Sequence, residues 1–240
     1  MTAIPSRRDE AWRYSDIDAV ASLWPVPPAE VITLAPGEVR EAALVVDGGV
    51  RDFAIILGAG ARYDFRILNI AERYSRVAID VTLHEGADFS MGVAQIAGGD
   101  ATVEIVTTVT HAEPGATSRQ VVRSVAGGTS TVTYLGKVAV ARDAQQTDSE
   151  QDVKAMLLER SATANAKPEL EIFADDVKCA HGCAIGELDA QALFYMQSRG
   201  MTPAEAKQVL LQAFVAGVFD GAEDAERLQA LALEKLGDLV

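Results

Sequence analysis

The sequence contains few cysteine, histidine, aromatic and basic residues, and each shortage argues against a particular kind of structure or function. It contains only two cysteines, Cys179 and Cys183, four positions apart. A disulfide between cysteines so close in sequence could hardly stabilise a whole domain, so a reduced, cytoplasmic protein is expected. Three histidines leave little from which to build a catalytic triad or a dehydrogenase site. Because aromatic residues make up only 6%, a carbohydrate-processing cleft is also unexpected, and the chain is not expected to be an enzyme.

Positive charge is scarce as well. Lysine and arginine number 21 against 35 acidic residues, which gives a net charge of −14. Nucleic acids and anionic membrane surfaces need a positive footprint, so neither is expected as the main partner. No run approaches the 18 or so apolar residues that a membrane span needs, and the first residues carry charges where a secretory signal would be apolar. The apolar content of 49% is ample for a core.

Residues 1–28 are predicted to form a helical arm. Ser6 and Ser15 each precede an acidic residue three positions further on, which is a weak helix-capping pattern. Ile17 and Val20 then recur at helical spacing, and a cluster of prolines ends the segment.

The sequence pattern of residues 29–187 is typical of an all-β core. Short runs rich in valine, isoleucine and threonine alternate with glycine and aspartate, and turn signals recur roughly every ten to fifteen residues. The pair Asp47-Gly48 is the one good candidate for a two-residue hairpin turn. A β-sandwich and a parallel β-helix both fit this pattern, which does not choose between them.

One segment inside this region reads locally as a helix. Thr147 to Glu150 form a capping box, and Val153, Met156 and Leu157 share one helical face. Local signals therefore predict a helix over residues 147–160.

Residues 188–240 are predicted to be helical. Asp189 can cap a helix that Gly200 ends, and Thr202 with Pro203 starts a second helix, which Gly221 separates from a third. The apolar stripes predicted for the second and third helices are, respectively, Val209, Leu210, Ala213, Phe214 and Val218, and Ala225, Leu228, Leu231 and Ala232. Both stripes are expected to pack on the chain's own core.

The densest group of reactive side chains is Cys179, His181 and Cys183. Residues two apart on a strand point to the same face, and thiolates with an imidazole suit iron–sulfur clusters, zinc or copper(I). Such neighbours lie roughly 6.6 Å apart, too far to enclose one ion alone. The segment therefore either offers one or two ligands to a site completed elsewhere, or holds two buried thiols and a satisfied histidine. His84 and His111 are interpreted as surface turn residues.

Four stretches carry a family resemblance: RRDEAWRYSDI near the start, HAEPGATSRQ at 111–120, PELEIFADDVKCAHG at 168–182 and LDAQALFYMQSRGM at 188–201. They resemble the SufB/SufD family of scaffold subunits of the SUF iron–sulfur cluster assembly system, and its SufD branch in particular. The resemblance covers most of the chain, and the third and fourth stretches are the most specific.

The resemblance implies a mainly β fold, with a right-handed parallel β-helix core over 29–187 between the arm and the helical region 188–240. It thereby assigns residues 147–160 to the β core. It also implies a cytoplasmic scaffold subunit that pairs with a SufB-like subunit and carries a SufC-like ATPase on its C-terminal helices. A transient iron–sulfur cluster would form at the shared interface, with no cofactor held permanently by the isolated chain. An isolated chain could pair with itself, as a homodimer, through the same face.

By its place in the family motif, His181 is the expected metal and cluster ligand, with Cys179 as a second donor. The family usually has serine where Ala180 stands and alanine where Cys183 stands, so Cys183 is expected to fill space. The chain is also shorter than expected of the family, and the missing length is assigned to the N-terminal helical region and early coils. The alternative is a purely structural adaptor of the same complex without a metal ligand, in which positions 179 and 181 would be buried and hydrogen bonded.

Overall fold

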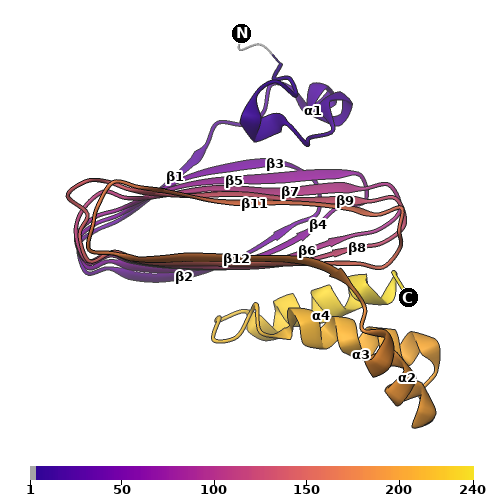
Figure 1. Cartoon of the computed structure of the whole chain (residues 1–240). Helices are drawn as coiled ribbons and strands as arrows, with labels where there is room; N and C mark the ends of the chain where they lie inside the picture. The colour runs from indigo at the N-terminus through magenta and orange to yellow at the C-terminus, as the bar shows by residue number, and fades with distance from the viewer. Residues whose placement is uncertain (1–3) are drawn as a thin grey trace.

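The chain folds into a parallel β-solenoid with a small arm on one side and a helical hairpin on the other (Figure 1). The structure is a computed structural model that describes residues 4–240. Consecutive strands alternate between two six-stranded sheets, and every strand pairing is parallel. The mainly β, parallel β-helix prediction is therefore confirmed, and the sandwich alternative is wrong.

The first sheet runs in the order β1 (Glu30–Leu34), β3 (Gly49–Leu57), β5 (Tyr74–Leu83), β7 (Thr102–His111), β9 (Thr131–Val140) and β11 (Thr163–Ile172). The second runs in the order β12 (Lys178–Glu187), β10 (Asp148–Leu157), β8 (Thr117–Ala126), β6 (Asp88–Ala97), β4 (Arg62–Ile70) and β2 (Val39–Val46). Side chains of alternate residues fill the space between the sheets, because successive residues of a strand point to opposite faces.

The corners of the coils stack directly on one another. Gly99 and Gly128 occupy equivalent corners with φ of +59° and +65°, a conformation that glycine adopts without steric cost. The Thr129 N–H donates to the Gly99 carbonyl at 2.7 Å, so one corner is bonded to the next. A side chain at Gly128 would have its Cβ only 2.7 Å from the Gly99 carbonyl oxygen.

Two local predictions inside the solenoid are wrong. Residues 147–160 do not form a helix, because Ser149, Gln151 and Val153 are buried at a period of two in β10, which pairs on both sides. Long-range pairing thus overrides the local capping box. The Asp47-Gly48 pair is not a hairpin turn but a corner that leads from β2 in one sheet to β3 in the other.

The N-terminal arm contains a 3-10 turn, η1 (Glu10–Trp12), and one short helix, α1 (Ile17–Leu23). The side chain of Asp16 caps α1 by accepting from two backbone N–H groups at 3.1 Å each. The predicted cap at Ser15 is therefore wrong by one residue, because that hydroxyl has a different partner.

A buried ion pair anchors the arm to the outer face of the first sheet. The Ser15 hydroxyl donates to the Glu104 carboxylate at 2.8 Å, and Arg76 donates to the same carboxylate at 2.7 Å. The Arg76 guanidinium also lies 3.9 Å from the centre of the Trp12 ring. Residues from the arm, β5 and β7 are thus joined in one network. Removal of either Arg76 or Glu104 would leave the other charge buried without a partner.

Three helices follow the solenoid: α2 (Ala190–Ser198), α3 (Pro203–Ala216) and α4 (Ala225–Gly237). The predicted caps are confirmed, since Asp189 caps α2 and Thr202 forms a reciprocal capping box with Glu205 at the start of α3. The predicted stripe on α3 is correct only in part: Val209 and Ala213 are exposed, whereas Phe214 packs on the core and Val218, just after the helix, is buried. The buried residues of α3 are Ala206, Leu211 and Val215. In α4 the predicted Leu228 and Ala232 are buried.

Helices α3 and α4 cover the outer face of the second sheet (Figure 1). Their apolar side chains pack on Leu68, Ala94 and Val125 of the sheet. Arg66 of β4 adds a polar clamp, because it donates to the Val218 carbonyl at 3.0 Å. No helix within residues 4–240 is both long and apolar enough to cross a membrane.

Gly92 in β6 provides a test of this docking. A Cβ there would lie 2.2 Å from the Val218 carbonyl oxygen and 2.5 Å from the Arg66 guanidinium, so the helical hairpin would have to move. We expect Gly92→Ala to lower the free energy of unfolding by about 1–3 kcal/mol, measured by urea denaturation. Gly186→Ala is the matched control, since nothing lies within 4 Å of its Cβ. Equal stability of the two variants would contradict this packing.

Candidate functional site

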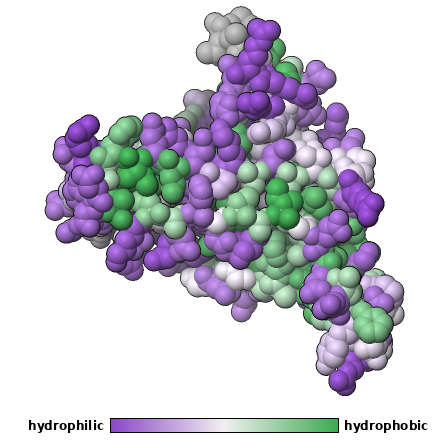
Figure 2. Space-filling model, viewed as in Figure 1, coloured by the Kyte–Doolittle hydropathy of each residue, from purple (hydrophilic) through white to green (hydrophobic). Residues whose placement is uncertain are grey.

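The last coil of the solenoid has no coil stacked upon it. Strands β11 and β12 are the last strands of their respective sheets (Figure 1). Side chains at positions that are buried between the sheets in earlier coils are therefore left uncovered here. Two large apolar residues at such positions are accordingly exposed, Ile172 at 38% and Ile185 at 47%, and Phe173, which follows β11, is 59% exposed. Hydrophobic side chains gather on this face of the molecule in Figure 2. We call this surface, formed by the inward-facing residues of β11 and β12, the open end.

The structure brings Cys179, His181 and Cys183 onto one face of β12. Their strand partners in β10 are Ser149, Gln151 and Val153, all of them buried between the sheets. The three reactive side chains therefore belong to the same inward-facing row, one coil further on. Because no further coil covers that row, Cys179 is only half-buried, and His181 and Cys183 are exposed.

The two thiols differ from freely solvated ones. Partial burial raises the pKa of both Cys179 and Cys183, which favours the protonated thiol. A backbone hydrogen bond from Ser149 opposes this effect at Cys179. A metal that binds here must therefore displace protons, since only the thiolate is a good ligand.

A chain of hydrogen-bonded side chains runs from beneath Cys179 into the solenoid. The Ser149 and Ser118 hydroxyls lie 2.9 Å apart, and Ser118 is 2.9 Å from Nε2 of His111. The interpretation of His111 as a surface turn residue is wrong, because this last residue of β7 faces inward and is fully buried. Burial lowers the pKa of His111 from 6.5 to about 4, so the imidazole is neutral at physiological pH.

A second polar row lies beneath His181. The hydroxyl of Tyr134 donates to Oε1 of Gln151 at 2.9 Å and lies 3.2 Å from Oε1 of Gln120. Thr107 completes this group by donating to Gln120 at 3.1 Å. The interior next to the open end is therefore polar and hydrogen bonded, in contrast to the aromatic packing near the first coils.

The sequence carried a signal for these two rows. Ser118 and Gln120 are two apart, Ser149 and Gln151 are two apart, and Cys179 and His181 continue the series. The pairs recur at intervals of 31 and 30 residues, and the strand register confirms that each pair lies directly above the last. A repeat of one polar pair per coil would have placed all of them in the interior.

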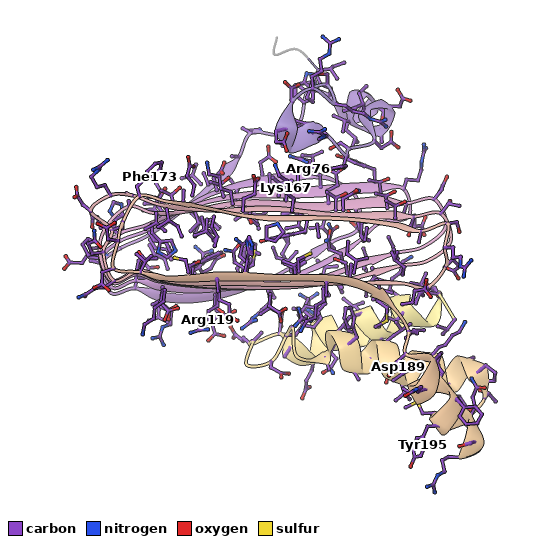
Figure 3. All side chains as sticks on the ribbon, in the orientation of Figure 1. Arg76, Arg119, Lys167, Phe173, Asp189 and Tyr195 are labelled. Atoms are coloured by element: carbon purple, nitrogen blue, oxygen red, sulfur yellow. The ribbon has the colours of Figure 1, made fainter. Side chains whose placement is uncertain are left out.

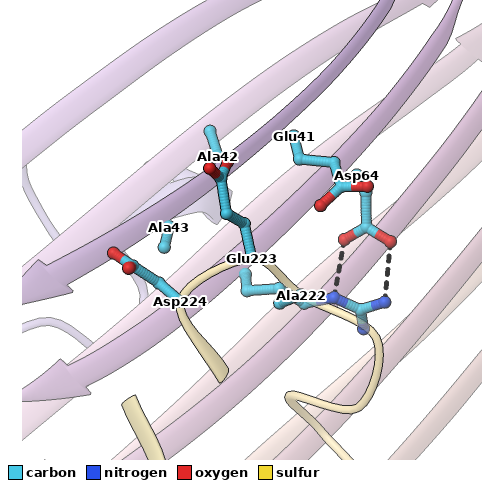
Figure 4. Close-up of a pocket in the computed structure, with 8 residues that line it drawn as sticks. Glu41, Ala42, Ala43, Asp64, Ala222, Glu223 and Asp224 are labelled. Atoms are coloured by element: carbon cyan, nitrogen blue, oxygen red, sulfur yellow. Dashed lines mark hydrogen bonds and ion pairs between the residues drawn. The ribbon is translucent and has the colours of Figure 1, made fainter. Parts of the chain in front are cut away.

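His84 and a cavity beneath the helical region have structural explanations. His84 is half-exposed and lies 3.1 Å from the Glu113 carboxylate, as a corner residue. A cavity of about 280 Å³ separates the α3–α4 connection from β2 and β4, and Glu41, Asp64 and Glu223 line it (Figure 4). Arg66 neutralises Asp64 there. Within the described residues 4–240, no three His, Cys, Asp or Glu side chains converge as a metal site.

Comparison with known proteins defines the family. The SufBD core domain of the SUF system for FeS cluster assembly matches residues 50–214 of the chain. The chain therefore belongs to the SufB/SufD family. The match extends from β3 through the solenoid and the open end into α3.

Three curated relatives are each similar to a part of the chain. The iron–sulfur cluster assembly protein SufD of Escherichia coli K12 is 33% identical over 131 residues, which are 55% of this chain and 31% of the relative. The chloroplastic protein ABCI7 of Arabidopsis thaliana is 37% identical over 140 residues, 58% and 28% respectively. The SufBD family protein slr0076 of Synechocystis is 32% identical over 152 residues, 63% and 34% respectively. The chain thus spans about a third of the length of these relatives.

The buried His111 predicts a pH dependence. Its folded-state pKa of about 4 lies below the ordinary 6.5, so the unfolded chain binds a proton in that interval and the folded chain does not. We expect the residue to reduce the free energy of unfolding by about 3 kcal/mol as the pH falls through this window.

Urea unfolding at a series of pH values measures this effect. In His111→Asn, which can still bond to Ser118, that part of the pH dependence should disappear, whereas the half-exposed control His84→Asn should keep it. An unchanged slope in the His111 variant would show that the imidazole is not buried in its neutral form.

Proposed function

We propose that the chain is a cytoplasmic scaffold subunit for iron–sulfur cluster assembly and not an enzyme. It meets a SufB-like subunit through the open end, and the nascent cluster is cargo bound between them. The family membership and the uncovered last coil support this proposal. An apolar surface that also has free backbone N–H and C=O groups along its edges is the kind of surface that another polypeptide covers.

The observation that carries the proposal is the exposure of His181 on the inward-facing row of an uncovered coil. One ring nitrogen of His181 coordinates the iron, and Cys179 is a second, softer donor. A single chain supplies too few ligands, so the set is complete only when the partner docks. An incomplete ligand set on each subunit also favours release of the cluster, because separation of the subunits removes the ligands that one of them supplies.

The adaptor alternative predicts the opposite environment for these residues. A side chain with no ligand role at this place would be buried and hydrogen bonded within its own subunit. The exposure of His181 and the half-buried thiol of Cys179 therefore favour the ligand role.

A second surface suits a SufC-like ATPase. Helix α2 projects away from the solenoid, with Phe194 exposed at 74% and Tyr195 at 60% (Figure 3). Next to it, a groove of about 420 Å³ lies between the α2–α3 turn and α3, lined by Met201 and Val209 among others. Two neighbouring exposed aromatic residues on a capped helix are typical anchors of a protein interface.

The ligand role predicts a loss of cluster in His181→Ala. Reconstituted with the SufB-like and SufC-like partners, this variant should retain the complex but lose most of the bound iron and sulfide, measured by chemical analysis and visible absorption. His84→Ala is the matched control, because it removes a partly exposed imidazole from a distant corner. Full cluster assembly in the His181 variant would refute the ligand role and favour the adaptor.

The ATPase surface predicts a separate loss of binding. Phe194→Ala should weaken the affinity for the ATPase about tenfold or more, equivalent to roughly 1.4 kcal/mol, in calorimetric titration. The control Val31→Ala removes an apolar side chain that is 67% exposed on β1, remote from α2. Equal affinities of the two variants would show that the ATPase binds elsewhere.

A further inference from the structure

The N-terminal arm crosses the outer face of the first sheet, from the first coils to the last. Its Val20 side chain is fully buried against Val50 of β3 and Tyr74 of β5. At the other end of the arm, the Glu10 carboxylate accepts from Nζ of Lys167 on β11 at 2.7 Å. Strands β7 and β9 separate these two contacts in the sheet. The start of the chain is thus bonded to its final coil, across 157 residues of sequence.

The arm is attached firmly over β5 and β7 and weakly over β11. In the firm part, the Ser15 hydroxyl and the Trp12 ring contact the buried ion pair of the sheet. In the weak part, the η1 turn has no buried residue, and a cleft of about 180 Å³ lies between it and the sheet. The Glu10–Lys167 pair is partly exposed, at 56% and 39%, and exposed ion pairs contribute little stability. Lys167 also pairs with Glu169 at 3.1 Å, so release of the arm leaves no unpaired charge.

Strand β11 is where such an attachment has the largest effect. Each coil of a solenoid is stabilised mainly by its neighbours, and terminal coils need a cap. Within the first sheet, β11 pairs with β9 on one side only. None of the ten residues of β11 is fully buried, whereas most residues of β9 are. The arm, which arrives from the opposite end of the sequence, supplies a contact that the missing next coil does not.

We infer that the arm is a strap that fastens the last coil, so that docking of the arm and order of β11 are thermodynamically coupled. The coupling is reciprocal: whatever lifts the arm loosens β11, and whatever orders β11 favours the docked arm. Because the bond to β11 is an exposed ion pair, salt weakens the coupling. This device goes beyond the proposed function, since it involves no metal ligand and no other subunit.

Amide hydrogen exchange of β11 tests the weak end of the strap. The N–H groups of Thr163 and Phe173 donate toward β9, so those of the odd-numbered residues between them do the same and report the order of β11. In Glu10→Gln these amides should exchange about two- to fivefold faster at low salt, and the difference from the native chain should vanish in about 1 M sodium chloride. The control Glu150→Gln breaks the exposed pair with Arg119 on the other sheet and should leave β11 unchanged. Native exchange of β11 in Glu10→Gln would overturn the inference.

A second variant tests whether the effect is transmitted along the arm. Val20→Asp places a charge in the apolar contact with β3 and β5 and should release the whole arm. Both tryptophans of the chain, Trp12 and Trp24, lie in the arm, so a red shift of tryptophan emission reports that release. The amides of β11 should then exchange at least as fast as in Glu10→Gln, while those of β9, paired on both sides, stay protected.

Two outcomes of this second experiment would overturn the strap. One is a released arm with native exchange in β11. The other is an equal increase in β9 and β11, which would mean that the effect travels through the sheet and not along the arm. If Val20→Asp does not fold, the result in Glu10→Gln decides alone.

Discussion

A parallel solenoid satisfies each strand through the coils before and after it, and its last coil has only one neighbour. This constraint determines the chemistry of the chain. Along β12 the free edge leaves backbone groups without partners, and the inward-facing row of Cys179, His181 and Cys183, which would be buried in any other coil, is left uncovered. The same geometry that builds the core thus leaves a reactive, partly apolar surface that another polypeptide can complete.

Polar side chains in the coils beneath the open end form hydrogen-bonded rows that continue the row of Cys179 and His181. The hydroxyls of Ser118 and Ser149 and the imidazole of His111 form a continuous chain beneath Cys179, while Gln151 and Tyr134 lie beneath His181. A buried polar group that is hydrogen bonded stays in one orientation, whereas an unsatisfied one would be costly. The interior beneath Cys179 and His181 is therefore polar, and its hydrogen bonds restrict how these side chains are oriented.

Much of the architecture could be predicted, although for different reasons in different places. The caps at Asp189 and Thr202 are local interactions, and local sequence specifies them fully. The prediction of a helix over 147–160 was wrong because this segment is a strand stabilised by β8 and β12, which lie about 30 residues away in sequence. The prediction that His111 lies at the surface was wrong for the same reason, since only the stacking of coils buries this residue. The shared face of Cys179, His181 and Cys183 followed from strand periodicity, but their exposure depends on which coil is last.

Hydrogen exchange along β12 tests the central claim most directly, namely that the open end is an interaction surface completed by a second polypeptide. The Lys178 N–H donates to the Thr147 carbonyl just before β10, so the alternating amides of Cys179, His181 and Cys183 point to the free edge and should exchange quickly in a dilute, isolated chain. They should become strongly protected in complex with the SufB-like subunit, while the amides of β6, paired on both sides, stay protected in both states. Protection of the β12 edge in the isolated monomer, or rapid exchange that persists in the complex, would contradict the account.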